Sequence, residues 1–519
     1  MTGLKYSGEW FLPENNLKLS GRLVIDEENK KISLELYGEQ YLDGSWVIIN
    51  NPDRDKRYRS KEHNHSYETR HIVILGTTRT LITLINCQWD GTEDIGVNTY
   101  LIKYQAKFAF FDAHIRSLAD LQIESGTFIY PYLSSWFDGF KSMNKLDYAS
   151  PNEFKLTDED EKDDPASISV TDSLHLVFFD QINRHMKEFG VHHETKFQKY
   201  LNLEYTEPAS FQNLLMDAAH FKRLLEFSHG KPLRNKLLKI KVRTDKLLNY
   251  IRPAYNPDKV DTIHLDVVNF TLHKGEDVFK HTQHQNYMLF SAWNMDVKEL
   301  NDIIQKWFVN EPMFSIYDIY LDSNNWFNHS DVQLSPVMFK NRFLNIVQGI
   351  EAYYREVLGS KTEQQNSDQE KENQLRKAEF DLKKNLILES LEKGSELKEW
   401  FNSHFKYKRF IEKDTGLENM LRSVMSQFDE HLKQIFGKSQ VLDFFPRYAS
   451  TIRNRLSHGN NHKEIPGKEL RIFFHAGQII LAICIMFSLD IKNIPEKITS
   501  YDLFARYITQ IRNTELHFR

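Results

Sequence analysis

The first 150 residues carry short runs in which apolar and polar positions alternate, the pattern of half-buried β-strands. In GRLVIDEENKKISLELYGE two such runs flank the polar residues Glu27–Glu28–Asn29, which predicts a hairpin. The segments HIVILG, TRTLITLINCQ and TYLIKYQAKFAFFDAHI continue with β-branched and aromatic residues. This part is therefore expected to be β-rich, up to an acidic run at Thr157–Pro165 that is interpreted as an exposed loop or linker.

Residues 166–330 mix strand and helix patterns. SISVTD, KFQKYLNLEYTE and KLLKIKV have strand character, whereas residues 211–230 have helical spacing and end in glycine, as helices often do. A second helix is predicted over 296–310. The apolar run MFSIYDIYLDSN at 313–324 is interpreted as one more strand.

From Ser335 onwards the apolar positions recur at helical spacing. Ser335–Pro336 is a good N-cap and first-turn pair. The predicted apolar stripe that follows contains Phe339, Phe343, Ile346, Val347, Ile350, Tyr354 and Val357. Further helices are predicted over 375–393, 397–405, 417–436, 446–458, 466–490 and 500–513. The fold class is therefore multidomain α+β, with a β-rich N-terminal region followed by an all-α helical bundle.

Length and composition support a soluble multidomain protein. A chain of 519 residues is too long for one hydrophobic core, and its 40% hydrophobic and 27% charged residues are ordinary for globular proteins. We expect one domain over 1–330, β-rich to about 150 and mixed α/β after it, and a second over 335–519. The net charge of −5 argues against a protein that coats nucleic acid, but leaves room for a local basic site.

Cysteine usage and the absence of a signal pattern indicate a reducing, cytoplasmic location. Cys87 and Cys484 cannot form a disulfide framework or a cysteine zinc site. The N-terminus lacks the charged-then-apolar pattern of a signal peptide. The most apolar run, Ile479–Leu489, is too short to span a bilayer and predicts a buried helix, so no membrane partner is expected.

The segment RNRLSH, residues 453–458, is the strongest candidate for chemistry. On a helix that begins at Pro446, a rotation of about 100° per residue separates two faces. The predicted buried stripe contains Tyr448, Ala449, Ile452 and Leu456, and the face turned away from it contains Arg453, Asn454, Ser457 and His458. Arg455 lies next to the stripe and is the weaker candidate. Gly459–Asn460 end the helix, which places His458 in the last turn, where the helix dipole favours its protonated form.

Such a set of side chains could cleave RNA without a metal or any other cofactor. A histidine that titrates near neutrality can serve as base or acid, and an arginine can stabilise the charge that develops on the phosphoryl oxygens. Between 447 and 471 there are six Lys or Arg residues against two acidic ones, which suits a polyanion. Because one helix offers one histidine, two facing copies would make a more complete site. Spacing alone nevertheless favours a simpler explanation, that Arg and His stabilise the helix end.

Other candidate sites are weaker. His63, His65 and His71, and separately His281 and His284, could each supply two metal ligands, but no further ligand follows at a recognised spacing. Surface histidines explain both groups, and VHHE at 191–194 is interpreted in the same way. No P-loop, GxGxxG or GxSxG sequence is present. His475 and Gln478 lie in an apolar helix, where we expect them to be hydrogen-bonded in the core or at a dimer interface.

Three segments resemble one known family. Arg453-Asn454-x-x-x-His458 resembles the R-x4-6-H motif of HEPN domains, including the polar residue after the arginine. GEWFLPENNLKLSGRLVIDEENKKISLELYGE is similar to the opening of the ApeA N-terminal domain, and FLNIVQGIEAYYRE to the first helix of the Apea-like HEPN domain. The resemblance covers most of the chain, with the N-terminal domain over 1–330 and HEPN over 335–519.

This resemblance implies an RNA endonuclease toxin of bacterial anti-phage abortive infection. The implied enzyme is a metal-independent homodimer that uses a 2′-hydroxyl attack and leaves a 2′,3′-cyclic phosphate. Its N-terminal region would sense a phage-derived trigger or restrain the nuclease. The implied catalytic residues are Arg453, Asn454 and His458.

Several further assignments stay open. Glu351 is a candidate supporting acid, although a structural salt bridge is at least as good an interpretation, and Ser457 and His462 are candidate substrate contacts. Transfer RNA is a reasonable substrate for a growth-arresting nuclease, but no residue argues for it. The alternative is a non-catalytic HEPN-like module for dimerisation or RNA binding.

Overall fold

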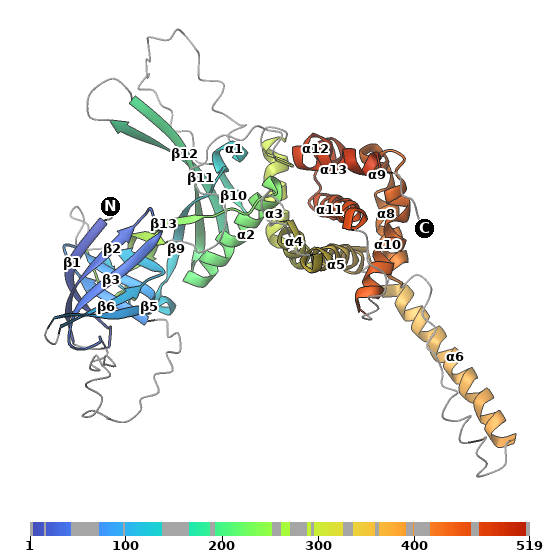
Figure 1. Cartoon of the computed structure of the whole chain (residues 1–519), viewed down its shortest axis with the longest axis horizontal. Coiled ribbons are helices and arrows are strands. Elements are labelled where there is room, and N and C mark those ends of the chain that lie inside the picture. Colours follow the sequence, from blue (N-terminus) through green and yellow to red (C-terminus); the bar gives the residue numbers. More distant parts are fainter. Residues whose placement is uncertain are drawn as a thin grey trace, which may run out of the picture. The chain divides into compact units, whose positions relative to one another are not determined.

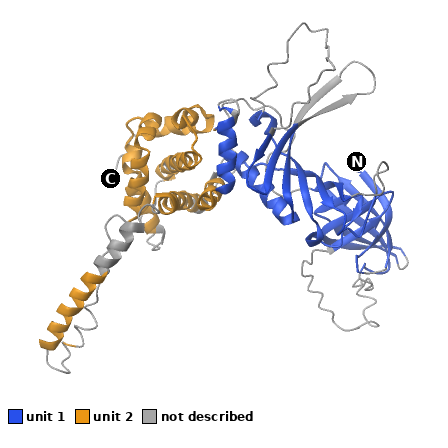
Figure 2. Cartoon of the chain, turned by 180° about the vertical axis from the view of Figure 1, so that it is seen from behind, with its two compact units in different colours: residues 1–284, 290–309 blue, residues 285–289, 310–519 orange. Residues whose placement is uncertain are grey.

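The chain divides into two compact units (Figure 2). Unit 1 contains residues 1–284 and 290–309, and unit 2 contains residues 285–289 and 310–519. The computed structural model describes residues 4–14, 17–42, 72–96, 99–137, 166–186, 193–251, 261–269, 288–291, 295–324, 336–358, 363–390, 398, 416–457 and 467–514. The β-rich region followed by a helical region confirms the predicted fold class.

Unit 1 is built on a large antiparallel sheet (Figure 1). In sheet order its strands are β10 (Ala166–Ser169), β11 (Leu174–Met186), β12 (His193–Ala209), β9 (Ile123–Ile129), β13 (Lys236–Arg243), β15 (Thr262–Asn269), β7 (Phe108–Phe111), β5 (Leu81–Gly96), β4 (Ile72–Thr77), β1 (Leu4–Phe11), β2 (Leu19–Asp26), β3 (Lys31–Gly38) and β6 (Thr99–Gln105). The short strands β8 (Ala113–His114) and β14 (Asn249–Tyr250) pair separately. The hairpin predicted around Glu27–Glu28–Asn29 is confirmed as β2 and β3.

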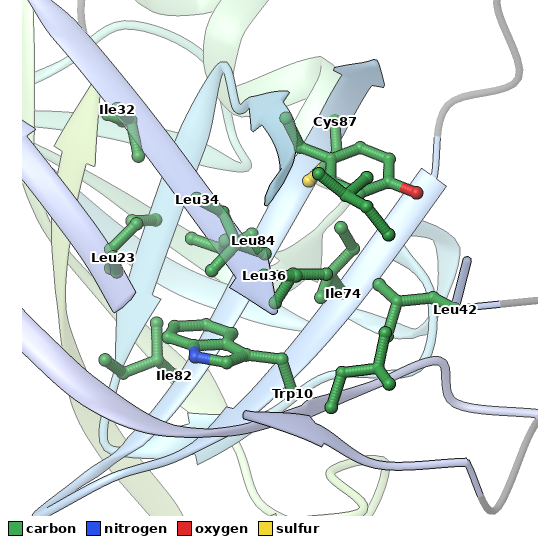
Figure 3. Packing of buried hydrophobic residues seen from close by; sticks show 14 of the residues in the cluster. Trp10, Leu23, Ile32, Leu34, Leu36, Leu42, Ile74, Ile82, Leu84 and Cys87 are labelled. Carbon is green, nitrogen blue, oxygen red and sulfur yellow. The ribbon is translucent and has the colours of Figure 1, made fainter. Parts of the chain in front are cut away.

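Six of these strands close into a ring. The first half of β5 pairs with β4 and its second half with β6, and β6 also pairs with β3, which joins both ends of the series β4–β1–β2–β3. Alternate side chains of these strands point into the ring, as period-2 patterning requires. Trp10, Leu23, Leu34 and Leu84 are fully buried in the resulting core (Figure 3).

The rest of unit 1 packs helices against the open part of the sheet. These helices are α1 (Leu133–Phe137), α2 (Phe211–His229) and α3 (Val297–Val309). Helix α2 begins where the Ser210 hydroxyl accepts a hydrogen bond from the Asn213 amide, and it ends at the left-handed Gly230. The Phe211 ring meets the edges of Phe108 and Phe110 on β7. The helices predicted over 211–230 and 296–310 are therefore confirmed.

Unit 2 is helical. Its helices are α4 (Glu311–Asn324), α5 (Pro336–Tyr353), α6 (Glu363–Ser390), α8 (Leu417–Gln427), α9 (Asp429–Phe436), α10 (Gln440–Ser457), α11 (Gly467–Ser488), α12 (Ile494–Ser500) and α13 (Asp502–Arg512). Helix α11 is the central element, since α4, α5, α10, α12 and α13 all contact it. Its residues Ile479–Met486 are completely buried, which confirms the predicted buried helix.

Helix α11 is longer than the apolar run in the sequence. By length and composition alone, Glu469–Ser488 could cross a membrane. However, 89% of its most apolar window is buried inside the bundle, as in the core helix of a soluble protein.

Several predicted elements differ from the structure. The strand predicted at 313–324 is wrong, because these residues form α4, with Met313, Ile316, Tyr317 and Tyr320 buried at helical spacing. The helix predicted over 417–436 is two helices that meet at Phe428, and α12 was not predicted. The predicted helix at 446–458 begins earlier, at Gln440, and contains Pro446 in its interior.

The end of α5 also departs from the predicted stripe. Residues Tyr354–Leu358 form a π-helical turn, which changes the angle between successive side chains. Tyr353, the last residue of α5 and three residues after Ile350, is the buried residue, whereas the predicted Tyr354 is only half-buried. The acidic run at Thr157–Pro165 lies outside the described residues, as does all of the predicted helix over 397–405 except Lys398.

Candidate active site on helix α10

Helix α10 presents a buried stripe and an exposed basic edge. Its side chains at Val441, Phe445, Ala449 and Ile452 are buried, so the predicted orientation of this helix is correct for Ala449 and Ile452. Asn454 is exposed, as expected. Arg455 is exposed, and its charge acts on Tyr448 of the predicted stripe, which agrees with the prediction that it lies next to that stripe.

Tyr448 lies at the margin of this stripe. Its ring stacks on that of Phe473 of α11, with the ring centroids 3.8 Å apart. Its hydroxyl is buried without a hydrogen-bond partner among the described residues. Burial raises the pKa of Tyr448, and the negative charge of Glu469 raises it further, whereas Arg455 opposes the shift. The phenol is therefore neutral and leaves a buried polar atom close to the basic edge.

Two glycines allow α5, α10 and α11 to approach closely. A Cβ atom at Gly477 of α11 would lie 2.8 Å from Ile346 Cγ2 on α5 and 3.2 Å from the Phe445 ring on α10. A Cβ atom at Gly349 of α5 would lie 2.7 Å from Leu481 Cδ2 on α11. The small residues thus set the spacing of the helices that carry the site.

Glu351 on α5 lies between two arginines. Its carboxylate Oε1 accepts a hydrogen bond from Nη2 of Arg355 at 2.7 Å, and its Oε2 is 3.7 Å from Nη2 of Arg453 on α10. The Glu351 side chain is 13% exposed, whereas that of Arg453 is 42% exposed. One largely buried carboxylate therefore restrains the Arg453 guanidinium but leaves part of it open to a ligand.

The structure brings together only part of the predicted site. It places Glu351 against Arg453 and keeps Asn454 on the same helix, while α10 ends at Ser457. His458 and His462 lie outside the described residues. Arg355 was missed by sequence reasoning, although its position four residues after Glu351 is a recognisable helical ion-pair spacing.

Further exposed arginines lie on other sides of α10 and on α11. Arg447 and Arg455 on α10 and Arg471 on α11 are exposed, and the nearby Glu469 is half-buried. Together with Arg355 and Arg453 they give this part of unit 2 a local excess of positive charge, despite the net negative charge of the chain. Such a local excess of arginine can attract a polyanion.

The remaining histidine candidates do not form metal sites in the described part of the chain. There, no group of three or more His, Cys, Asp or Glu side chains is arranged to hold a metal ion. The clusters His63–His71 and His281–His284 lie outside the described residues.

His475 is a core residue. It is buried, and its Nδ1 shares a hydrogen bond of 2.9 Å with Oε1 of Gln478. Its ring stacks on that of Tyr507, with the ring centroids 3.6 Å apart. Burial lowers its pKa to about 4. The prediction that His475 and Gln478 are hydrogen-bonded is confirmed, and His475 stays neutral at physiological pH.

Comparison with protein families gives two matches in chain order. The family model described as ApeA N-terminal domain 1 matches residues 5–307, which is more than half of the chain, and that described as Apea-like HEPN matches residues 344–495. The second match contains Glu351, Arg453 and the whole RNRLSH segment. Searches of the curated proteins and of the solved structures found no match.

Proposed function

Because the chain belongs to the ApeA family and carries a HEPN domain of the Apea type, we propose that it is an endoribonuclease effector of anti-phage defence. The observation that carries the proposal is the restraint of Arg453 by Glu351 within the matched HEPN region. That contact leaves a partly exposed, permanently charged guanidinium at a basic edge. This positive charge can stabilise the negative charge that develops on the phosphoryl oxygens in the transition state of phosphodiester cleavage.

The proposed reaction is an internal displacement at phosphorus. The RNA 2′-oxygen forms a bond to phosphorus while the bond between phosphorus and the 5′-oxygen breaks, which yields a 2′,3′-cyclic phosphate and a 5′-hydroxyl. His458 takes the proton of the 2′-hydroxyl or donates one to the leaving oxygen. Arg453 stabilises the charge on the non-bridging oxygens, and Asn454 orients a phosphate oxygen or the histidine. None of these steps calls on a metal or a cofactor.

A second copy of the chain completes this mechanism. The reaction needs a base and an acid, and the motif supplies a single histidine per chain. Two copies of Arg453 and His458 facing each other would supply both. We therefore propose a composite site in a homodimer of the helical domain over 335–519.

Glu351 has a positioning role in this proposal. Its carboxylate is engaged by two guanidinium groups, so it fixes the direction of Arg453. Ser457 and His462 remain candidate contacts to the RNA. The domain over 1–330 would act as the sensor of a phage-derived trigger or as the restraint on the nuclease, in the cytoplasm, and transfer RNA is a candidate substrate.

The test compares full-length wild type, Arg453→Ala and His458→Ala on total RNA in the presence of EDTA. Arg422→Ala is the matched control, because Arg422 on α8 is a partly exposed arginine that also pairs with a glutamate, Glu418, but lies outside the candidate site. Loss of Arg453 should slow cleavage by about 10²–10³-fold, and loss of His458 by about 10²–10⁴-fold. The control should cleave like wild type, and the products should carry 2′,3′-cyclic phosphate ends. Equal cleavage by all four proteins, or strict dependence on a divalent metal, would refute the nuclease.

The ion pair itself favours one alternative, a non-catalytic HEPN module for dimerisation or RNA binding. An arginine held by a largely buried carboxylate is also what a purely structural bridge would look like. This alternative predicts that cells carrying His458→Ala keep their protection against phage. A protective His458→Ala protein that binds RNA without cutting it would establish the binding module.

A further inference from the structure

Helix α6 exposes a row of leucines. It is a continuous helix of 28 residues (Figure 1), and its Leu375, Leu382 and Leu386 side chains are 71%, 63% and 58% exposed. At a rotation of about 100° per residue these three lie within about 40° of one another. They form one narrow apolar stripe, which we name the leucine face, while the exposed Ile387 lies about 120° away from it. Exposed apolar rows of this kind mark interaction surfaces.

The opposite side of α6 is the covered one. Phe380, Lys384 and Leu388 are half-buried and follow one another at four-residue spacing, about 180° from the leucine face. The leucine face is thus the more exposed side of α6. A long helix without tertiary packing is marginal in water, so its apolar face needs a partner.

We propose that the leucine face binds the same face of α6 in a second copy of the chain, with the two helices antiparallel. In the matching register, Leu375 of each copy lies opposite Leu386 of the other. Leu382 then lies near the two-fold axis. The surface is self-complementary, as an isologous contact must be.

Charges beside the leucine face select the antiparallel direction. Glu379 and Lys383 lie on one flank of it, where they form an ion pair of 2.6 Å within the chain. In an antiparallel pair each Glu379 lies beside Lys383 of the second copy, which gives two further attractive pairs. A parallel pair in register would instead set this flank against the other flank of the second copy, where Ala378 and Asn385 lie and offer no opposite charge.

This contact is separate from the one that a composite active site would use. In the register of Leu375 opposite Leu386, an antiparallel pair puts the first residues of the two α6 helices at opposite ends of a rod about 52 Å long, from a rise of 1.5 Å per residue. The same two chains would then not also bring their Arg453 edges together through this pairing. The contact joins two chains if it acts alone, and links two dimers into a tetramer if the composite site also forms.

The first test measures the mass of full-length protein by light scattering after size exclusion. Leu382→Lys/Leu386→Lys should halve the mass of the wild-type assembly, whichever stoichiometry wild type has. Lys377→Glu is the control, because Lys377 is exposed on the far side of α6 and should leave the mass unchanged. An unchanged mass for the double leucine variant would overturn the proposal.

The second test leaves the leucines unchanged, so its result does not depend on whether the double leucine variant folds correctly. Glu379→Lys alone and Lys383→Glu alone should each weaken association at least tenfold, and the combined charge swap should restore it. Failure of the combined variant to restore association would overturn the antiparallel register.

The third test fixes the direction by disulfide trapping, since the native Cys87 and Cys484 are both buried. A mixture of Leu375→Cys and Leu386→Cys chains should cross-link under mild oxidation, while neither variant cross-links efficiently alone. Efficient self-cross-linking of each single variant would indicate a parallel pair and refute the proposed geometry.

Discussion

Adding one methyl group at Gly477 should destabilise the helical bundle. The Cβ atom of an alanine there would lie 2.8 Å from Ile346 Cγ2 and 3.2–3.3 Å from two atoms of the Phe445 ring. Both neighbours are completely buried, and the isoleucine side chain is stiff at χ1, so neither can move aside freely. The substitution therefore forces α11 away from α5, α10 or both.

Two opposing terms decide the sign of the change in unfolding free energy. Glycine to alanine inside a helix stabilises it by about 0.5–1 kcal/mol. Overpacking a dense core costs about 1–3 kcal/mol, and a distance below 3.0 Å to a rigid methyl group belongs to the upper part of that range. We expect Gly477→Ala to lower the unfolding free energy of the bundle by about 1–2 kcal/mol.

Gly467→Ala is the matched control, since nothing lies within 4 Å of its added Cβ on the same helix. It should be neutral or slightly stabilising. Hydrogen exchange of the α11 amides reports the opening of the bundle itself, without requiring both units to unfold together. The reasoning is refuted if α11 is as well protected in Gly477→Ala as in Gly467→Ala.

Three further predictions follow from other contacts. Burial lowers the pKa of His475 to about 4 from 6.5. The contribution of the neutral imidazole to the unfolding free energy is therefore complete above pH 6.5 and declines towards pH 4. The unfolding free energy of the bundle should fall by about 2 kcal/mol by pH 5. Urea unfolding across this range should show the loss in wild type, and a His475→Leu bundle with the same pH dependence would contradict it. A double-mutant cycle of Glu351→Gln and Arg453→Gln should give a coupling of about 0.5–1 kcal/mol, because Arg453 is partly solvated; additive effects would mean that the 3.7 Å contact has no energetic weight. Ser210→Ala should cost about 1 kcal/mol through loss of the N-cap of α2, and amide exchange at the first turn of α2 would detect it.

The sequence predicts those elements whose signals are local. Alternation and a polar turn identify the hairpin of β2 and β3, and Gly230 marks the end of α2. The run at 313–324 defeats this reasoning because it is rich in aromatic and β-branched residues while its buried positions follow the helical period. Closure of the ring through β5 also stays hidden, since it depends on pairings with β4 and β6 that alternation does not encode.

The candidate site, too, is only partly predictable from the sequence. The motif at Arg453 and the position of Glu351 can be recognised in the sequence, and helical spacing correctly places Asn454 on the exposed side. The contact between Glu351 and Arg453 depends on how closely α5 and α10 approach, which Gly349 and Gly477 control through α11. No periodicity within α10 reports that approach, so the sequence alone left the roles of Arg355 and Glu351 open.

The pairing of β6 with β5 has a consequence for the colloidal behaviour of unit 1. An open antiparallel sheet has two edge strands, each a template for cross-β aggregation. Among the described strands of the large sheet, ring closure leaves β10 as the terminal strand, and open edges also remain along 179–186 of β11 and 193–200 of β12, which pair only with each other. There Gln305 Nε2 of α3 donates a hydrogen bond of 2.7 Å to the Ser169 carbonyl oxygen, which occupies an acceptor that an incoming strand would need. Strand addition is thereby hindered at β10, so where chains are brought together at high local concentration the hairpin of β11 and β12 is the part of this sheet on which another strand could add.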